Sequence, residues 1–109
     1  EMEAVPAALL RGRSPENVFI AEASGDCLRG RMIADGDWVF LERLQPGQQP
    51  RNGDIVAVRL HDEVTLKIWY RDGDWIELRD ADDKLVHRFS IFDDYEVEGV
   101  VFARYGVTH

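Results

Sequence analysis

The chain has 109 residues and a mass of 12.5 kDa, which suits one domain with a single core. Its net charge of -8 argues against binding of this domain to the phosphate backbone of DNA, which requires a surface rich in lysine and arginine. One cysteine excludes an internal disulfide, and the apolar runs are far shorter than the roughly 20 residues of a membrane-spanning helix. We therefore expect a soluble, cytoplasmic protein with no contact with a membrane, in which any contact with DNA comes from outside this domain.

Short runs rich in β-branched and aromatic residues, separated by turns containing glycine and aspartate, predict a mostly β domain with little helix. In chain order the predicted strands are Val18–Glu22, Trp38–Arg43, Asp54–Leu60, Val64–Tyr70, Trp75–Arg79, Arg88–Phe92 and Tyr95–Tyr105. The turns "RLHDEV" and "YRDGDW" predict that residues 54–79 form three consecutive antiparallel strands. The segment Pro46–Asp54 is predicted to be a loop that crosses between two strands. Helix is expected only as a turn or two, at Ala4–Gly12 and in "CLRGRM".

Two side chains, Lys67 and Cys27, are candidates for chemistry. Alternation along Val64–Tyr70 places Lys67 in the middle of a strand, on one face with Thr65 and Trp69. The chain has eleven arginines but only two lysines, and a buried lysine, unlike an arginine, can lose its proton and act as a general base. The structural alternatives are a lysine that lies over Trp69 on an edge strand and a cysteine that fills the core as a small hydrophobic residue.

The other polar clusters predict no metal site and no other cofactor. His61, His87 and His109 do not have the spacing of metal ligands. The Asp-Gly-Asp segments at Asp35–Asp37 and Asp72–Asp74 lack the late glutamate of a calcium-binding loop, and we interpret them as solvated turns.

Four segments, "EASGDC", "IADGDWVFLER", "NGDIVAVRLHDEVTLKIWY" and "YEVEGVVFARYG", resemble in their order the C-terminal domain of the LexA repressor and UmuD family of self-cleaving proteins. That family has a Ser-Gly-x-Ser-Met turn with the nucleophile, an Asp-Gly-Asp before a strand, an Asn-Gly-Asp-Ile-Val strand, a Val-x-Lys strand with the base, and a closing Gly-x-Val strand. The resemblance implies an open, twisted β-structure of the LexA/signal-peptidase-like (β-clip) type. It also implies an N-terminal arm or linker over residues 1–17 and a peptidase and dimerisation domain over residues 18–109.

By this resemblance Cys27 occupies the position of the catalytic serine, Lys67 is the general base, and the backbone N–H groups of Asp26 and Cys27 are the oxyanion donors. We expect Cys27 and Lys67 to be in contact and the thiol to be more acidic than that of an ordinary cysteine. Two further differences from the family pattern are Leu28 in place of methionine and the absence of the Ala-Gly or Cys-Gly bond that the family cleaves.

The resemblance further implies a homodimer formed at Val100, Val101, Phe102 and Ala103, and a RecA filament as the trigger of autocatalytic cleavage in a repressor of the SOS (DNA-damage) or prophage type. A long apolar strand left as a free edge would invite aggregation, which favours the dimer. Two other functions fit the same residues. One is a non-cleaving dimerisation module of a repressor, in which Cys27 is idle, and the other is an UmuD-like polymerase-accessory protein. The signal peptidases that share this fold are disfavoured because the sequence has no membrane anchor.

Overall fold

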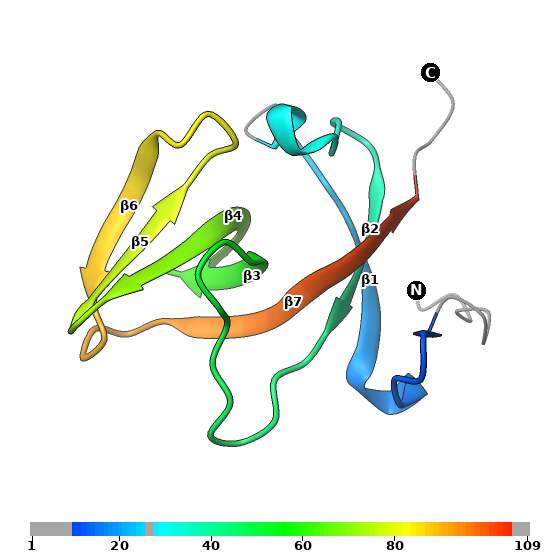
Figure 1. Ribbon diagram of the computed structural model, residues 1–109, viewed down its shortest axis with the longest axis horizontal. Helices are drawn as coiled ribbons and strands as arrows, with labels where there is room; N and C mark the ends of the chain where they lie inside the picture. Colours follow the sequence, from blue (N-terminus) through cyan, green and yellow to red (C-terminus); the bar gives the residue numbers. More distant parts are fainter. Residues whose placement is uncertain (1–9, 26–27, 106–109) are drawn as a thin grey trace.

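A single antiparallel sheet dominates the computed structural model, which describes residues 10–25 and 28–105 (Figure 1). Seven strands lie within these residues, in the spatial order β1-β2-β7-β3-β4-β5-β6. Two 3-10 turns, η1 (Pro15–Asn17) and η2 (Arg29–Arg31), flank β1. The strands are β1 (Val18–Glu22), β2 (Trp38–Glu42), β3 (Ile55–Leu60), β4 (Glu63–Asp72), β5 (Trp75–Arg79), β6 (Leu85–Ser90) and β7 (Glu96–Tyr105). The predicted mostly β fold is confirmed, and no helix in the described part of the chain is long and apolar enough to cross a membrane.

The connections follow the predicted pattern. Strands β3, β4 and β5 form a meander of antiparallel neighbours, as the two hairpin turns indicated. Strand β7 lies between β2 and β3. The loop that joins β2 to β3 therefore crosses from one side of β7 to the other. The end of this loop is held against β4, because Gly53 donates its N–H to the carbonyl oxygen of Trp69 and Trp69 donates to that of Asp54, both at 2.8 Å.

Strand β7 runs across the whole molecule and connects its two halves (Figure 1). Its first half, Glu96–Val100, pairs with β3, and its second half, Val100–Tyr105, pairs with β2. The premise that this strand would be a free edge is therefore wrong. Its long apolar run is explained by pairing within the chain, since each half has a neighbouring strand and side chains that pack on the core.

Strand β6 begins and ends earlier than predicted. The prediction placed it at Arg88–Phe92, whereas it extends from Leu85 to Ser90 and residues 91–94 form a turn. Short polar contacts explain the early end: Ser90 donates its N–H to Asp93 Oδ2 at 2.8 Å, and Phe92 donates its N–H to Ser90 Oγ at 3.1 Å. These side-chain acceptors replace a partner strand, which is how serine and aspartate favour turns over sheet. Phe92 is left 81% exposed.

Two core clusters lie on opposite faces of the sheet, because successive side chains of a strand point in opposite directions. Ile68 and Trp69 are neighbours in β4, yet each belongs to a different cluster. The first cluster consists of Ala23, Leu28, Ile33, Val39, Leu41, Ala57 and Ile68. The second cluster consists of Val56, Val58, Trp69, Ile76, Leu78 and Phe89.

The described part of the predicted N-terminal arm packs on the sheet. Leu10 is buried, and the Arg13 guanidinium lies 4.0 Å from the ring centre of Phe102 on β7. Arg13 also pairs with Glu42 at the end of β2 at 3.2 Å. Residues 10–13 therefore cover part of the face where β2 and β7 meet.

Candidate functional site

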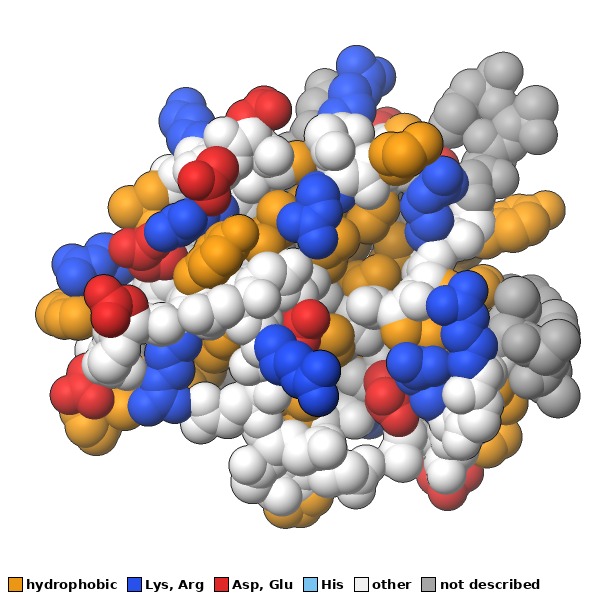
Figure 2. Space-filling view, in the orientation of Figure 1, with side chains coloured by type: hydrophobic (Ala, Val, Ile, Leu, Met, Phe, Trp, Pro, Cys, Tyr) orange, Lys and Arg blue, Asp and Glu red, His pale blue; other side chains and the backbone are white. Residues whose placement is uncertain are grey.

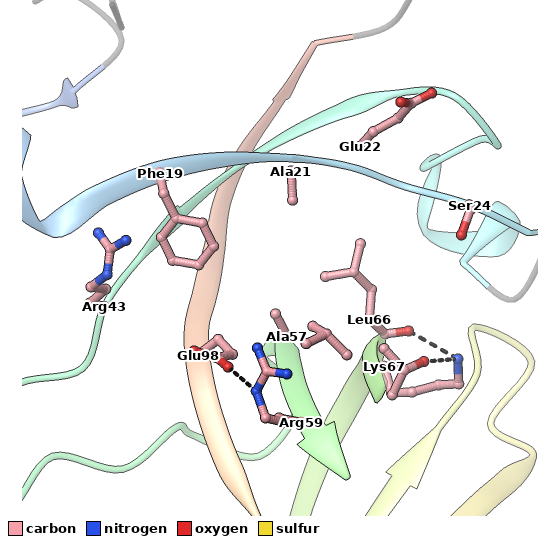
Figure 3. A pocket seen from close by; sticks show the side chains of 12 residues that line it. Phe19, Ala21, Glu22, Ser24, Arg43, Ala57, Arg59, Leu66, Lys67 and Glu98 are labelled. Atoms are coloured by element: carbon pink, nitrogen blue, oxygen red, sulfur yellow. Dashed lines mark hydrogen bonds and ion pairs between the residues drawn. The ribbon is translucent and has the colours of Figure 1, made fainter. Parts of the chain in front are cut away.

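Lys67 is half-buried on β4, at the point where the pairing of that strand changes. Strand β3 pairs with Glu63–Ile68, whereas β5 pairs only from Ile68 onward, so Lys67 has a strand on one side alone. Its Nζ atom donates to Thr65 Oγ1 at 2.8 Å and to the carbonyl oxygen of Leu66 at 3.2 Å (Figure 3). The predicted mid-strand position is confirmed, and β5 has no residue paired with Lys67.

The segment that contains Cys27 is held on both sides. Cys27 and Asp26 themselves lie outside the described residues, so the contact of Cys27 with Lys67 and the oxyanion role of the two backbone N–H groups stay predictions. Before them, Gly25 has a φ of +86°, which favours glycine, and donates its N–H to Asp35 Oδ1 at 2.8 Å. After them, Leu28 is only 3% exposed and its carbonyl oxygen accepts the N–H of Ile33 at 3.2 Å. The residue before this segment is therefore held by an exposed hydrogen bond, and the residue after it is buried in the core.

The Asp35–Asp37 segment has a structural role that the sequence interpretation missed. Asp37 is 3% exposed and its Oδ2 atom accepts the N–H of Ala34 at 2.9 Å, so the interpretation as a solvated turn is wrong for this residue. Asp37 also binds Ala23 through its backbone, since its carbonyl oxygen accepts the Ala23 N–H at 2.8 Å. Together, Asp35 and Asp37 attach the end of β1 to the start of β2. The position of this motif, directly before a strand, was the signal for such a role.

The turn η2 lies close to the turn between β5 and β6, which comes from a distant part of the sequence. A Cβ atom added to Gly30 would lie 3.1 Å from Ala81 Cβ, in the turn between β5 and β6. Figure 1 shows η2 and the β5–β6 turn close together, although about fifty residues separate them in the sequence. Arg31 adds a hydrogen bond from Nη2 to the carbonyl oxygen of Gly53 at 3.3 Å. Contacts remote in sequence thus help to position the segment next to Cys27.

A cavity of about 430 Å³ connects these elements, and we call it the Lys67 cavity. Lys67 and Ser24, which is three residues before Cys27, lie at one end of it (Figure 3). Phe19, Arg43 and Arg59 lie toward the opposite end, with Ala21, Ala57 and Leu66 between them. The cavity is open to solvent, apolar along its middle and charged at both ends. Such a shape suits an extended peptide better than a compact small molecule.

The predicted dimer residues are all half-buried within the chain. Val101 packs against the first core cluster and Val100 against the second, so the two side chains face opposite sides of the sheet. Phe102 lies 6.4 Å from Phe40, measured between ring centres, and under the guanidinium of Arg13. Of this strand, only Arg104 and Tyr105 at its end, and Glu96 at its start, are exposed. The dimer itself stays a prediction.

Comparison with known proteins points to one family. The family model described as Peptidase S24-like matches residues 1–102. The LexA repressor of Desulfatibacillum aliphaticivorans is 48% identical over 65 residues, which are 60% of this chain and 30% of that protein. The LexA repressor of Moorella thermoacetica is 39% identical over 80 residues, covering 70% of this chain and 38% of that protein. The LexA repressor of Thermotoga maritima is 36% identical over 83 residues, covering 76% and 41%. The chain therefore spans less than half the length of these relatives.

Proposed function

Because the chain belongs to the Peptidase S24-like family, we propose that it is the C-terminal self-cleavage and dimerisation domain of a LexA-like repressor, with Cys27 as nucleophile and Lys67 as general base. The observation that carries this proposal is the Lys67 cavity, which has Lys67 and Ser24 at one end. Because Ser24 is three residues before Cys27, a peptide in the cavity would lie between the amine and the segment that bears the thiol.

The proposed chemistry is acyl transfer to sulfur. Uncharged Lys67 Nζ takes the thiol proton, and Cys27 Sγ attacks the carbonyl carbon of a peptide bond. The backbone N–H groups of Asp26 and Cys27 stabilise the oxyanion, each by about 3 kcal/mol. The ammonium then protonates the leaving nitrogen, and water hydrolyses the thioester. The hydrogen bonds of Nζ to Thr65 Oγ1 and to the carbonyl oxygen of Leu66 support this role, since they orient the amine.

A thiol in place of a serine hydroxyl changes which group holds the proton before attack in this mechanism. A thiol ionises more readily, so a thiolate and ammonium pair forms before attack and the nucleophile is ready. Cleavage then depends on the ammonium delivering its proton to the leaving nitrogen. In a full-length repressor, the RecA filament would trigger this step, the DNA-damage (SOS) response would be its setting, and the homodimer would hold two domains together.

The test is the rate of iodoacetamide alkylation of Cys27 against pH, for the parent chain and for Lys67→Ala. We expect the two pH profiles to differ, because loss of a neighbouring ammonium removes the attraction that favours thiolate. Lys84→Ala is the matched control, since Lys84 is the only other lysine and lies before β6. If both profiles have the same midpoint near pH 8.5, which is roughly the unperturbed pKa of cysteine, then Cys27 and Lys67 are not in contact.

A cleavage assay separates this function from that of an idle dimerisation module. The domain is mixed with a second polypeptide that carries an Ala-Gly bond, and products are followed by mass spectrometry. We expect slow cleavage by the parent, none by Cys27→Ala, and altered cleavage by Cys27→Ser. Cleavage that survives Cys27→Ala would exclude the thiol as nucleophile.

A further inference from the structure

We propose that the Lys67 cavity binds an extended peptide that carries an acidic side chain about three residues from the bond next to Lys67, and that Arg43 and Arg59 bind this side chain. The inference rests on the proposed function and names the class of its substrate. It concerns the end of the cavity opposite Lys67 and Ser24, which we call the arginine end (Figure 3).

The arginine end is formed by a stack of three residues from three parts of the chain. Gly99 on β7 has no side chain, and a Cβ there would lie 2.8 Å from Phe19 Cε1. The ring of Phe19, on β1, therefore lies directly against β7. The Arg43 guanidinium, just after β2, lies 4.6 Å from the centre of that ring. A cation over an aromatic face is held in place without being neutralised.

The charges at this end are not fully compensated. Arg59 pairs with Glu98 through Nε and Oε1 at 2.7 Å, so its other guanidinium nitrogens remain for another acceptor. Among the residues that the structure describes, no carboxylate forms an ion pair with Arg43, whose Nη1 donates at 3.4 Å to the backbone oxygen of Glu16. Two arginines and one glutamate thus line this end of the cavity, in a chain with a net charge of -8. This local excess of positive charge favours a carboxylate ligand.

Positive side chains do not collect in one stripe elsewhere on the visible face. Figure 2 shows Lys and Arg side chains scattered among acidic and hydrophobic ones over this face. A binding preference for acidic groups would therefore come from the local arrangement at the arginine end, since the long-range field of the acidic chain opposes it.

The register of the sheet gives the spacing. Val56 on β3 is opposite Lys67, and Arg59 is three residues further along the same strand. Three residues of an extended strand span about 10 Å. A peptide that lies extended in the cavity, with its scissile bond at Lys67, would therefore present a side chain about three residues away to Arg59, and Arg43 lines the same cavity.

The experiment measures binding, so it does not depend on cleavage. Fluorescein-labelled eight-residue peptides of alanine and valine carry a central Ala-Gly, and one glutamate is placed at each flanking position in turn. Each has a partner peptide with glutamine at the same position. Binding to Cys27→Ala, which retains the cavity residues, is followed by fluorescence anisotropy. We expect glutamate at one position, about three residues from the Ala-Gly bond, to bind roughly tenfold more tightly than glutamine.

Variants identify the residues responsible. Arg43→Gln should abolish the preference for glutamate, and Arg59→Gln should reduce it. Arg51→Gln is the matched control, because Arg51 is exposed in the β2–β3 loop and does not line the cavity. Equal affinity for glutamate and glutamine at every position, no binding of any peptide, or a preference that survives Arg43→Gln would overturn the proposal.

The outcome is distinguishable from that of the proposed function. If glutamate is preferred but the alkylation profiles coincide, the proposed acidic-peptide site stands and the proposed contact of Cys27 with Lys67 is wrong. If glutamate is not preferred but the alkylation profiles differ, the proposed contact of Cys27 with Lys67 stands and the proposed acidic-peptide site is wrong.

Discussion

Gly99 shows how one residue without a side chain determines the shape of the cavity. At this position an added Cβ would lie 2.8 Å from Phe19 Cε1 and 3.0 Å from the carbonyl oxygen of Glu42. A Cβ atom is almost never found within 3.0 Å of another side-chain or backbone atom outside its own chain neighbours, so a larger residue would displace the Phe19 ring or the strands. The Gly-x-Val element in the sequence thus has a steric reason.

We therefore expect Gly99→Ala to destabilise the domain by about 1–3 kcal/mol, because overpacking shifts side chains and backbone in a close-packed region. Urea unfolding measures the loss. In the background of Phe19→Ala the same substitution should cost less, since one of the two clashing groups is gone. Additive effects of the two substitutions would show that the clash with Phe19 is not the cause.

Thr65 is a positioning residue for Lys67, since its Oγ1 atom accepts a hydrogen bond from Nζ at 2.8 Å. Thr65→Val has nearly the same shape but no acceptor, so the amine loses one of its partners. We expect the pH profile of Cys27 alkylation to change in this variant, with stability lowered by less than about 1.5 kcal/mol.

Thr65→Ser keeps the hydroxyl and should restore the parent profile. If Thr65→Val and the parent chain have the same profile, then the hydrogen bond seen in the structure does not position the amine for the thiol.

At the level of elements, the segment between β1 and β2 depends on carboxylates that serve as local acceptors. Asp35 accepts the N–H of Gly25 on one side of Cys27, and the buried Asp37, just before β2, accepts the N–H of Ala34. A carboxylate acceptor also ends β6, where Asp93 accepts a hydrogen bond from the N–H of Ser90. In each case a short side chain accepts a hydrogen bond from the backbone N–H of a residue that is three to ten residues away in or beside a turn.

Asp37→Ala should lower the free energy of unfolding by about 1–3 kcal/mol, because it leaves the Ala34 N–H without its acceptor in a partly buried site. Asp37→Asn keeps an oxygen and should cost less. Asp82→Ala is the control: Asp82 is exposed in the β5–β6 turn, and we expect a change within about 0.5 kcal/mol. Equal losses in Asp37→Ala and Asp82→Ala, measured in urea, would contradict the structural role of Asp37.

At the scale of the whole molecule, β7 links the β1–β2 half to the β3–β6 half, and we propose its exposed end as the contact of the proposed dimer. Val101 is unsuitable for testing the dimer, because its side chain packs on the core and a charge there would unfold the chain. Tyr105, at the end of β7, is 63% exposed and lies opposite the exposed Trp38 on β2.

We expect Tyr105→Asp to convert the proposed dimer to a monomer in sedimentation velocity experiments, because a carboxylate in an apolar contact loses its hydration. Phe92→Asp is the control, since Phe92 is an even more exposed aromatic residue in the β6–β7 turn. A parent chain that is monomeric at high micromolar concentration, or a dimer that withstands Tyr105→Asp, would contradict dimerisation through this end.

The strands, their turns and the position of Lys67 were predictable because they depend on local patterns. Period-two alternation and turn residues act within a few residues of each other, so six of the seven strands were placed within about two residues of their observed ends. Even the end of β6 was set locally, by Asp93, but a side-chain acceptor in a turn competes with strand propensity in a way that alternation does not reveal.

The tertiary structure alone decided what lies together across the sheet. Four features join residues that are far apart in the sequence. They are the position of β7 between β2 and β3, the burial of Asp37, the close approach of Gly30 to Ala81, and the stack of Gly99, Phe19 and Arg43. Such contacts depend on strand order and twist, which are properties of the entire sheet rather than of any segment. The sequence alone therefore determined which residues form strands and carry chemistry, and the folded sheet decided the shape and charge of the cavity around Lys67.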